Sequence, residues 1–169
     1  GPLLFIGRDV PKKGLKTLIQ ALSLLPDSVR LKVIGVASGP ELDGRVRYLG
    51  PQSQKQILEQ MEGCSLMVLP CQTAQDGDRD GLPVALMEAM ASGLPVLTTS
   101  LPGLEDLVDL QVGWIAPPAD PLALAREITQ ALQSPEALHQ RGQAGRARIH
   151  QDFTLAQQVD AVEAIWGQH

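Results

Sequence analysis

Two acidic residues that stand eight positions apart, Asp80 and Glu88, are the first candidates for chemistry in this sequence. Glu88 lies within an almost entirely apolar segment, residues 82–91, which reads as a helix without an obvious polar face. An ionised carboxylate in apolar surroundings is costly unless it is paired or hydrogen-bonded. Three outcomes are open for Glu88: it meets an arginine or backbone donors, it extends to solvent at the sheet edge, or it accepts hydrogen bonds from two vicinal hydroxyls of a ligand.

The spacing of these two carboxylates excludes some kinds of site. Eight residues of helix rise ~12 Å, whereas the carboxylate pair of a glycosidase needs roughly 5–9.5 Å. At this separation the two acids cannot share one metal ion either, but they can hold opposite ends of one long ligand. The alternative for Asp80 is a helix N-cap, a position for which Asp78 competes.

A basic stretch near the start of the chain, GRDVPKKG at residues 7–14, is the second candidate. Gly7 ends an apolar run, and Arg8 and Lys13 follow just where a helix is expected to begin. Cations at a helix N-terminus oppose the helix dipole, so their presence favours a multiply charged anion bound there by side chains and backbone N–H groups. The alternative is a solvated basic turn. Neither a P-loop nor a G-x-G-x-x-G motif is present.

Composition limits the classes of function. The chain has 169 residues, 44% hydrophobic and 20% charged, which suits a single domain, 1–169, with its own core. A net charge of −5 and 3% aromatic residues argue against a nucleic-acid partner. The cysteines, Cys64 and Cys71, indicate neither a disulfide framework nor a zinc site. Neither a secretory leader nor a membrane-spanning apolar run is visible, so the cytoplasm is the expected compartment.

Short strands and helices alternate along the chain, which predicts the elements that position these residues. The strands are continuous and rich in Val, Leu and Ile, as strands covered on both faces are. We therefore expect an α/β fold: a Rossmann-like, doubly wound parallel sheet of about six strands with helices on both faces. Ligands bind such sheets at the carboxyl ends of the strands. The predicted strands are 3–7, 31–35, 46–50, 66–70, 95–99 and 112–117; the predicted helices are about 13–25, 52–63, 81–92, 121–133, 135–150 and 155–166, with a short one inside 101–108.

Several of these motifs together resemble a known family. In order and spacing, GRDVPKKG, LKVIG, VRYLG, LMVLP and DGLPVALMEAMASGLPVLTT are similar to the C-terminal half of retaining GT-B glycosyltransferases of the GT4 group. The resemblance covers essentially the whole chain. It implies one half of a GT-B fold, a domain that binds a nucleotide-diphospho-sugar donor.

The resemblance also implies roles for individual residues. Glu88 matches the glutamate that holds the ribose hydroxyls, and Asp80 matches an acid near the donor sugar, although the family has glutamate there. Arg8 and Lys13 match the cations that neutralise the diphosphate, so Arg8, Lys13 and Asp80 are the catalytic candidates. The other donor contacts implied are Gly7, Leu49, Gly50, Gly81, Leu82 and Val84, of which Leu49 and Gly50 lie near the base.

The same resemblance implies partners outside this chain. The family's N-terminal domain, which binds the acceptor, is absent here, and a peripheral membrane association through that missing half stays open. No cofactor and no metal are expected, since the nucleotide-sugar is a substrate. The alternatives are a GT-B-fold sugar-nucleotide epimerase and a degenerate, non-catalytic interaction module.

Overall fold

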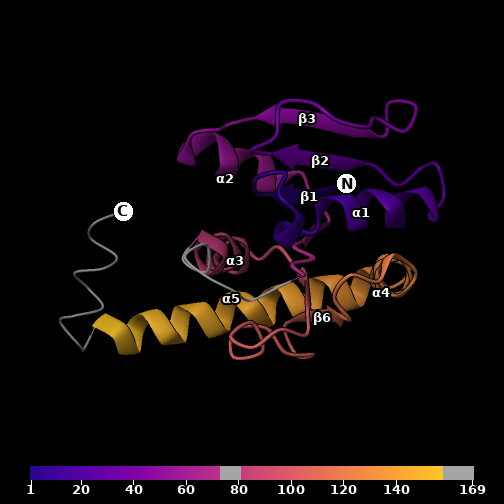
Figure 1. The fold of residues 1–169 in the computed structure, drawn as a ribbon. Coiled ribbons are helices and arrows are strands. Elements are labelled where there is room, and N and C mark those ends of the chain that lie inside the picture. Colours follow the sequence, from indigo (N-terminus) through magenta and orange to yellow (C-terminus); the bar gives the residue numbers. More distant parts are fainter. Residues whose placement is uncertain (73–80, 158–169) are drawn as a thin grey trace.

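The protein forms one fully parallel sheet of six strands (Figure 1). The computed structural model describes residues 1–72 and 81–157, and only the backbone of 81–83 and 152–157. The strand order is β3-β2-β1-β4-β5-β6, which is the Rossmann order and confirms the predicted fold class. The strands are β1 (Leu3–Ile6), β2 (Leu31–Ile34), β3 (Val46–Gly50), β4 (Leu66–Val68), β5 (Val96–Thr99) and β6 (Gly113–Ala116).

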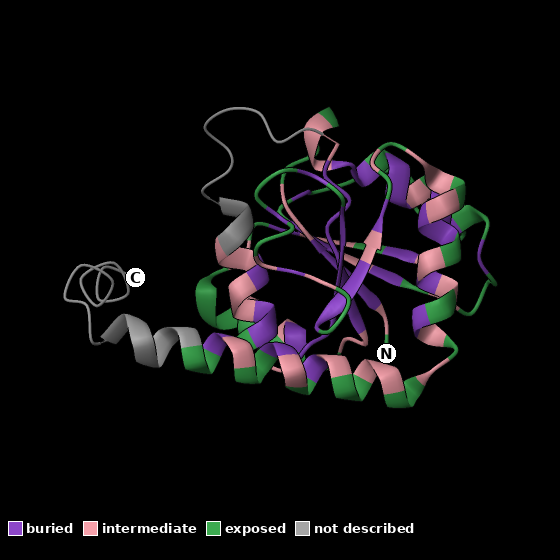
Figure 2. Cartoon of the chain, turned by 90° about the horizontal axis from the view of Figure 1, so that it is seen from below, coloured by how far each residue is buried: buried purple, intermediate pink, exposed green. Residues whose placement is uncertain are grey.

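Helices cover both faces of this sheet, and Figure 2 shows the strands running between them. On one face α1 packs against α4; on the other, Met61 of α2 meets Ser92 just after α3, and α5 crosses α3. The helices are a 3-10 turn η1 (Pro11–Lys13), α1 (Leu15–Ser23), α2 (Gln54–Glu62), α3 (Gly81–Ala91), α4 (Pro121–Leu132) and α5 (Pro135–Gln157).

The core sits between the strands and the inner faces of these helices. All four residues of β5 and all three of β4 are buried, so these central strands show no alternation of exposed and buried positions. This is the burial expected for a parallel sheet covered on both sides. It confirms the prediction made from their continuous apolar runs.

The centre of the sheet is a topological switch point. β1 and β4 are hydrogen-bonded neighbours, but the chain leaves β1 toward β2 on one side and leaves β4 toward β5 on the other. Because the crossover helices then lie on opposite faces, the carboxyl ends of β1 and β4 open a crevice between them. The two loops that follow these strands border it.

Three predicted helix boundaries are wrong. The first helix begins at Leu15 rather than residue 13, because Gly14 is left-handed at φ +79° and separates α1 from η1. Residues 101–108 form successive turns instead of a short helix, since Gly103 at φ +92° interrupts the helical path. Up to Gln157 the two predicted C-terminal helices are one helix, α5, since no Gly or Pro lies between residues 146 and 157 to end it; the rest of the second predicted helix, 158–166, lies outside the described residues.

The end of α3 is held by a very close contact with α5. Gly142 of α5 lies so near Gly93 that a Cβ on Gly142 would overlap the Gly93 carbonyl oxygen, and Gly145 packs on Met90. Leu94 N–H donates to Ala89 O and Gly93 N–H to Met90 O, the Schellman pattern that ends α3. The two backbones therefore touch where α3 terminates.

α5 also covers the β6 edge of the sheet. Arg141 stacks on the Trp114 ring at 4.2 Å and donates from Nη1 to the Gly113 carbonyl at 2.9 Å. Arg148 forms an ion pair with Asp109 at 3.1 Å. These contacts satisfy part of an exposed strand edge and fix the long helix across the domain.

Candidate functional site

Glycines form the carboxyl edge of three neighbouring strands. Gly7, Gly35 and Gly50 lie at the ends of β1, β2 and β3. Gly7 N–H donates to Ile34 O at 3.0 Å and Gly35 N–H to Gly50 O at 2.8 Å. Gly35 is left-handed at φ +100°, and a Cβ there would overlap the Gly7 carbonyl. The floor of this edge is therefore backbone, which lets a ligand approach peptide groups closely.

The basic turn after β1 is held against the end of β4. Gly14 at φ +79° packs so tightly on the Pro70 carbonyl that a Cβ at position 14 would overlap it. The Lys13 side chain folds back over the strand end, with its Cδ 3.8 Å from the position of a Cβ on Gly7. Lys13 is half-buried in this turn, whereas Arg8 is exposed.

Hydrogen bonds join the ends of β1, β4 and β5. Gln72 N–H donates to Lys12 O at 2.9 Å, and Gln72 Nε2 donates to Thr17 Oγ1 at 2.7 Å. Thr99 Oγ1 donates to Cys71 O at 2.7 Å. The chain beyond β4 is thereby attached to the basic turn at the switch point.

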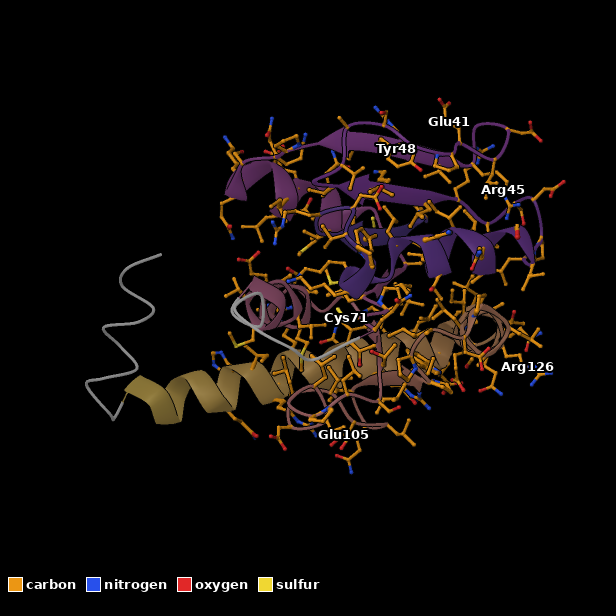
Figure 3. All side chains as sticks on the ribbon, in the orientation of Figure 1. Glu41, Arg45, Tyr48, Cys71, Glu105 and Arg126 are labelled. Carbon is orange, nitrogen blue, oxygen red and sulfur yellow. The ribbon has the colours of Figure 1, made fainter. Side chains whose placement is uncertain are left out.

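The electrostatics at this point are set by Lys13 and by burial. Burial raises the pKa of the Cys71 thiol to about 11, and the Lys13 charge partly offsets this rise. The positive charge of Lys13 is therefore felt at Cys71, in the chain just beyond β4. Figure 3 shows Cys71 near the middle of the molecule, away from its outer surface.

Helix α3 presents its N-terminal end to the same edge. It ends beside the start of β5 and so runs antiparallel to the strands, which puts Gly81 at their carboxyl side. A helix N-terminus offers free N–H groups and a partial positive charge. The strand ends, the basic turn and this helix start together can bind a negatively charged group.

Glu88 lies on the outer side of α3. Leu86, Ala89 and Met90 are buried, whereas Glu88 is half-buried and Ala91 is exposed. The helix is therefore not buried on all sides, although its outer side is mostly apolar apart from Glu88. Alanine and other small apolar residues tolerate exposure and do not reveal which side packs. Within the described residues, the carboxylate of Glu88 makes no hydrogen bond or ion pair with protein.

The structure brings together some of the predicted site residues. Gly7, Arg8 and Lys13 share one turn; Leu49, half-buried, and Gly50, buried, lie at the end of β3 on the same sheet edge. Val84 is half-buried in the first turns of α3, which begins at Gly81 and includes Leu82. Among the described residues, no hydrogen bond or ion pair joins Glu88 to Lys13. Asp80 lies outside the described residues.

Sequence reasoning missed the residues that hold the site in place. Gly14, Pro70 and Gln72 come from loops more than fifty residues apart, and their contact is tertiary. The available signals were a glycine directly after two lysines and a polar residue directly after an apolar strand. Two absences apply to the described residues alone: no group of three or more His, Cys, Asp or Glu side chains is placed to hold a metal ion, and no helix is long and apolar enough to cross a membrane.

Comparison with known proteins decides the family. Residues 2–148 match the model of the family described as glycosyl transferases group 1. The chain belongs to this family. The resemblance stated from the sequence is thereby confirmed at the level of the family and of the GT-B fold.

Individual group 1 glycosyltransferases are similar over part of their length. The amylovoran biosynthesis glycosyltransferase AmsK of Erwinia amylovora is 33% identical over 166 residues, which cover 89% of this chain and 40% of that protein. A putative colanic acid biosynthesis glycosyltransferase, WcaL of Escherichia coli, is 30% identical over 168 residues, covering 89% and 41%. The chain thus spans about 40% of the length of these relatives.

A solved structure shares the fold. HepE of Anabaena in complex with UDP superposes with a TM-score of 0.80 at 24% identity, covering 96% of this chain and 48% of that one. At this identity the match concerns the arrangement of strands and helices. It agrees with the six-stranded parallel sheet described above.

Proposed function

We propose that this chain is the donor-binding domain of a retaining glycosyltransferase of the GT4 group, which transfers a hexosyl unit from a nucleotide-diphospho-sugar to an acceptor. The observation that carries the proposal is the joining of the basic turn to the end of β4 at the switch point, through Gly14 on Pro70 and Gln72 on Lys12. Membership in the family supports the reaction class. The UDP bound by HepE supports the ligand class.

Each part of the donor has a candidate partner in this arrangement. The diphosphate lies over the glycine floor beside Arg8 and Lys13, and the free N–H groups at the start of α3 add to their positive charge. The ribose hydroxyls bind Glu88, and the base lies toward Leu49 and Gly50. The donor sugar extends toward Asp80 and the acceptor domain, which belongs to a longer protein.

The chemistry follows from where charge develops. Breaking the glycosidic bond leaves negative charge on the diphosphate, and cations that are already in place stabilise that charge more in the transition state than in the ground state. Lys13 is pre-positioned because its stem packs over Gly7. In the full-length enzyme, removing Arg8 or Lys13 is expected to lower the rate roughly 10²-fold. No metal and no cofactor are needed for this step.

Calorimetric titration of the 169-residue chain with UDP, GDP and ADP tests donor binding. The Lys13→Ala variant should bind the preferred nucleotide about 10-fold or more weakly, since a charge-assisted contact is lost. Arg126→Ala is the matched control, because Arg126 is an exposed cation of α4 (Figure 3). No measurable binding of any of the three nucleotides would overturn the proposal.

A second titration tests Glu88 against the ribose. Glu88→Ala and the control Glu59→Ala, an exposed acid of α2, are compared with ordinary and 2′-deoxy nucleoside diphosphates. If Glu88 holds the ribose, the wild type should bind the deoxy ligand less well than the ordinary one, and Glu88→Ala should lose that difference. A wild type that binds both ligands equally would assign Glu88 another role.

A further inference from the structure

The connection between β2 and β3 contains no helix. Parallel strands are usually joined by a crossover helix, but residues 36–41 have no regular secondary structure and 42–45 form a turn; hydrogen bonds attach both ends of the segment to β3. Leu42, Asp43 and Gly44 are all left-handed, at φ +49°, +58° and +84°. Consecutive left-handed residues other than glycine are strained, so other contacts must hold this segment in place.

Tyr48 of β3 supplies two of these contacts, at Gly39 and Pro40, which precede the left-handed residues. Its hydroxyl donates a hydrogen bond to the Pro40 carbonyl. Gly39 lies on its ring, where a Cβ would stand 2.7 Å from the hydroxyl oxygen and 2.9 Å from Cζ. At the two ends of the segment, Gly50 N–H donates to Val36 O at 3.0 Å, and Val46 N–H donates to Glu41 O at 3.0 Å.

The segment that Tyr48 holds borders the basic turn after β1. Its first residue, Gly35, packs against the Gly7 carbonyl. Burial, then the charges of the Asp9 and Glu41 carboxylates, raise the pKa of Tyr48, so negative charge from the loop after β1 and from the segment after β2 acts on this tyrosine. Figure 3 shows Tyr48 and Glu41 together at the β3 side of the molecule, with Cys71 nearer its centre.

We propose that Tyr48 is a positioning residue for the nucleoside end of the donor site: its hydroxyl and ring hold Pro40 and Gly39 alongside β3, in the same segment whose first part, Val36, is hydrogen-bonded to Gly50 at the carboxyl end of that strand. This inference rests on the proposed function, which puts the base near Leu49 and Gly50. Tyr48 itself does not touch the donor. It helps to fix the segment 36–40 against which the nucleoside packs, while the basic turn binds the diphosphate independently.

The test separates the nucleoside from the phosphates. Tyr48→Phe keeps the ring and removes the hydrogen bond to Pro40, and is titrated with the nucleoside diphosphate that the wild type prefers and with inorganic pyrophosphate. We expect the nucleoside diphosphate to bind about 5-fold more weakly, the worth of one hydrogen bond, and pyrophosphate to bind as before. Gly39→Ala, which pushes the segment off the ring, should have the same selective effect.

A control variant removes a comparable hydroxyl elsewhere. Thr129 Oγ1 donates to Ala125 O at 2.8 Å within α4, and Thr129→Val should leave both ligands unaffected. Equal weakening of both ligands by Tyr48→Phe, or no change in either, would overturn the positioning role while leaving the proposed function intact. Failure of the wild type to bind any nucleotide would instead remove the proposed function itself.

Discussion

Replacing Gly14 by alanine tests the joint between the basic turn and β4. Two costs combine at this position. Gly14 is left-handed at φ +79°, which costs an alanine about 1–2 kcal/mol. Its Cβ would also overlap the Pro70 carbonyl, and overpacking of this kind costs about 1–3 kcal/mol. The free energy of unfolding should therefore fall by about 2–5 kcal/mol.

Alanine substitutions at three other glycines separate the cost of the left-handed backbone from the cost of the Cβ overlap. Gly63 has an ordinary φ of −92° and open space around it, so Gly63→Ala should be neutral or stabilising by up to about 1 kcal/mol. Gly50, at φ +65° with open space, should show the strain alone. Gly142, whose Cβ would overlap the Gly93 carbonyl within a helix, should show the overlap, offset by about 1 kcal/mol of helix propensity.

Urea unfolding of the four variants measures these differences. Nucleoside diphosphate binding by Gly14→Ala should also weaken by about 10-fold or more, because displacement of Lys13 by about 1 Å is enough for such a loss. If Gly14→Ala costs no more stability than Gly50→Ala, the contact with Pro70 does not hold the turn, and the reasoning that places Lys13 at the switch point fails.

The remaining predictions concern stability and reactivity. Arg45 donates to the carbonyls of four residues at and after the end of α1, so Arg45→Ala should lower the free energy of unfolding by about 2–4 kcal/mol in urea titrations. The Thr98 hydroxyl is buried without a partner among the described residues, so Thr98→Val should leave the melting temperature unchanged or raise it. Burial raises the pKa of Asp109, but hydrogen bonds from Arg148 and from the Gln111 and Val112 backbone amides, together with the Arg148 charge, outweigh burial and lower the pKa overall. The contribution of Asp109 to stability is therefore present above about pH 3.9 and lost as pH falls through the lower folded value, and Asp109→Asn should flatten acid unfolding curves over that range. With a pKa of about 11, Cys71 is almost entirely a thiol at pH 8, and mass spectrometry should find it alkylated by iodoacetamide far more slowly in the native than in the unfolded chain.

The sheet could be predicted from the sequence because its signals are local. Each strand is a short apolar run bounded by glycine, proline or polar residues. Helices lie in three of the five connections between successive strands, and a connection that contains a helix is typical of parallel crossovers. The ends of the helices were harder to predict from the sequence. Gly14 follows two lysines in a sequence that looks helical throughout, and only its packing on Pro70 selects the left-handed conformation.

The candidate site could be predicted only in part, because some of its contacts are tertiary and leave no local signal in the sequence. The type and position of Arg8, Lys13 and Glu88 pointed to an anionic, hydroxyl-bearing ligand, since charge at a strand end and in an apolar helix needs a partner. Which side of α3 faces outward could not be predicted, because alanine and methionine occur both on buried and on exposed sides of helices. The role of Tyr48 was likewise hidden, since its partner Pro40 lies in a segment that sequence describes only as a connection.

The backbone contact between Gly142 and Gly93 fixes the C-terminal end of α3, so a small tilt at that end moves the N-terminal end by a larger distance. The helix has eleven residues, so its first turn stands ~16 Å from the end that α5 grips. A tilt of about 5° at that end would swing the opposite one by about 1.4 Å, more than a transferase tolerates between its donor and its reacting groups. If the proposed function holds, substitutions in a distant helix should alter transfer without touching any ligand, and screens for altered sugar transfer should sample α5 as well as the crevice.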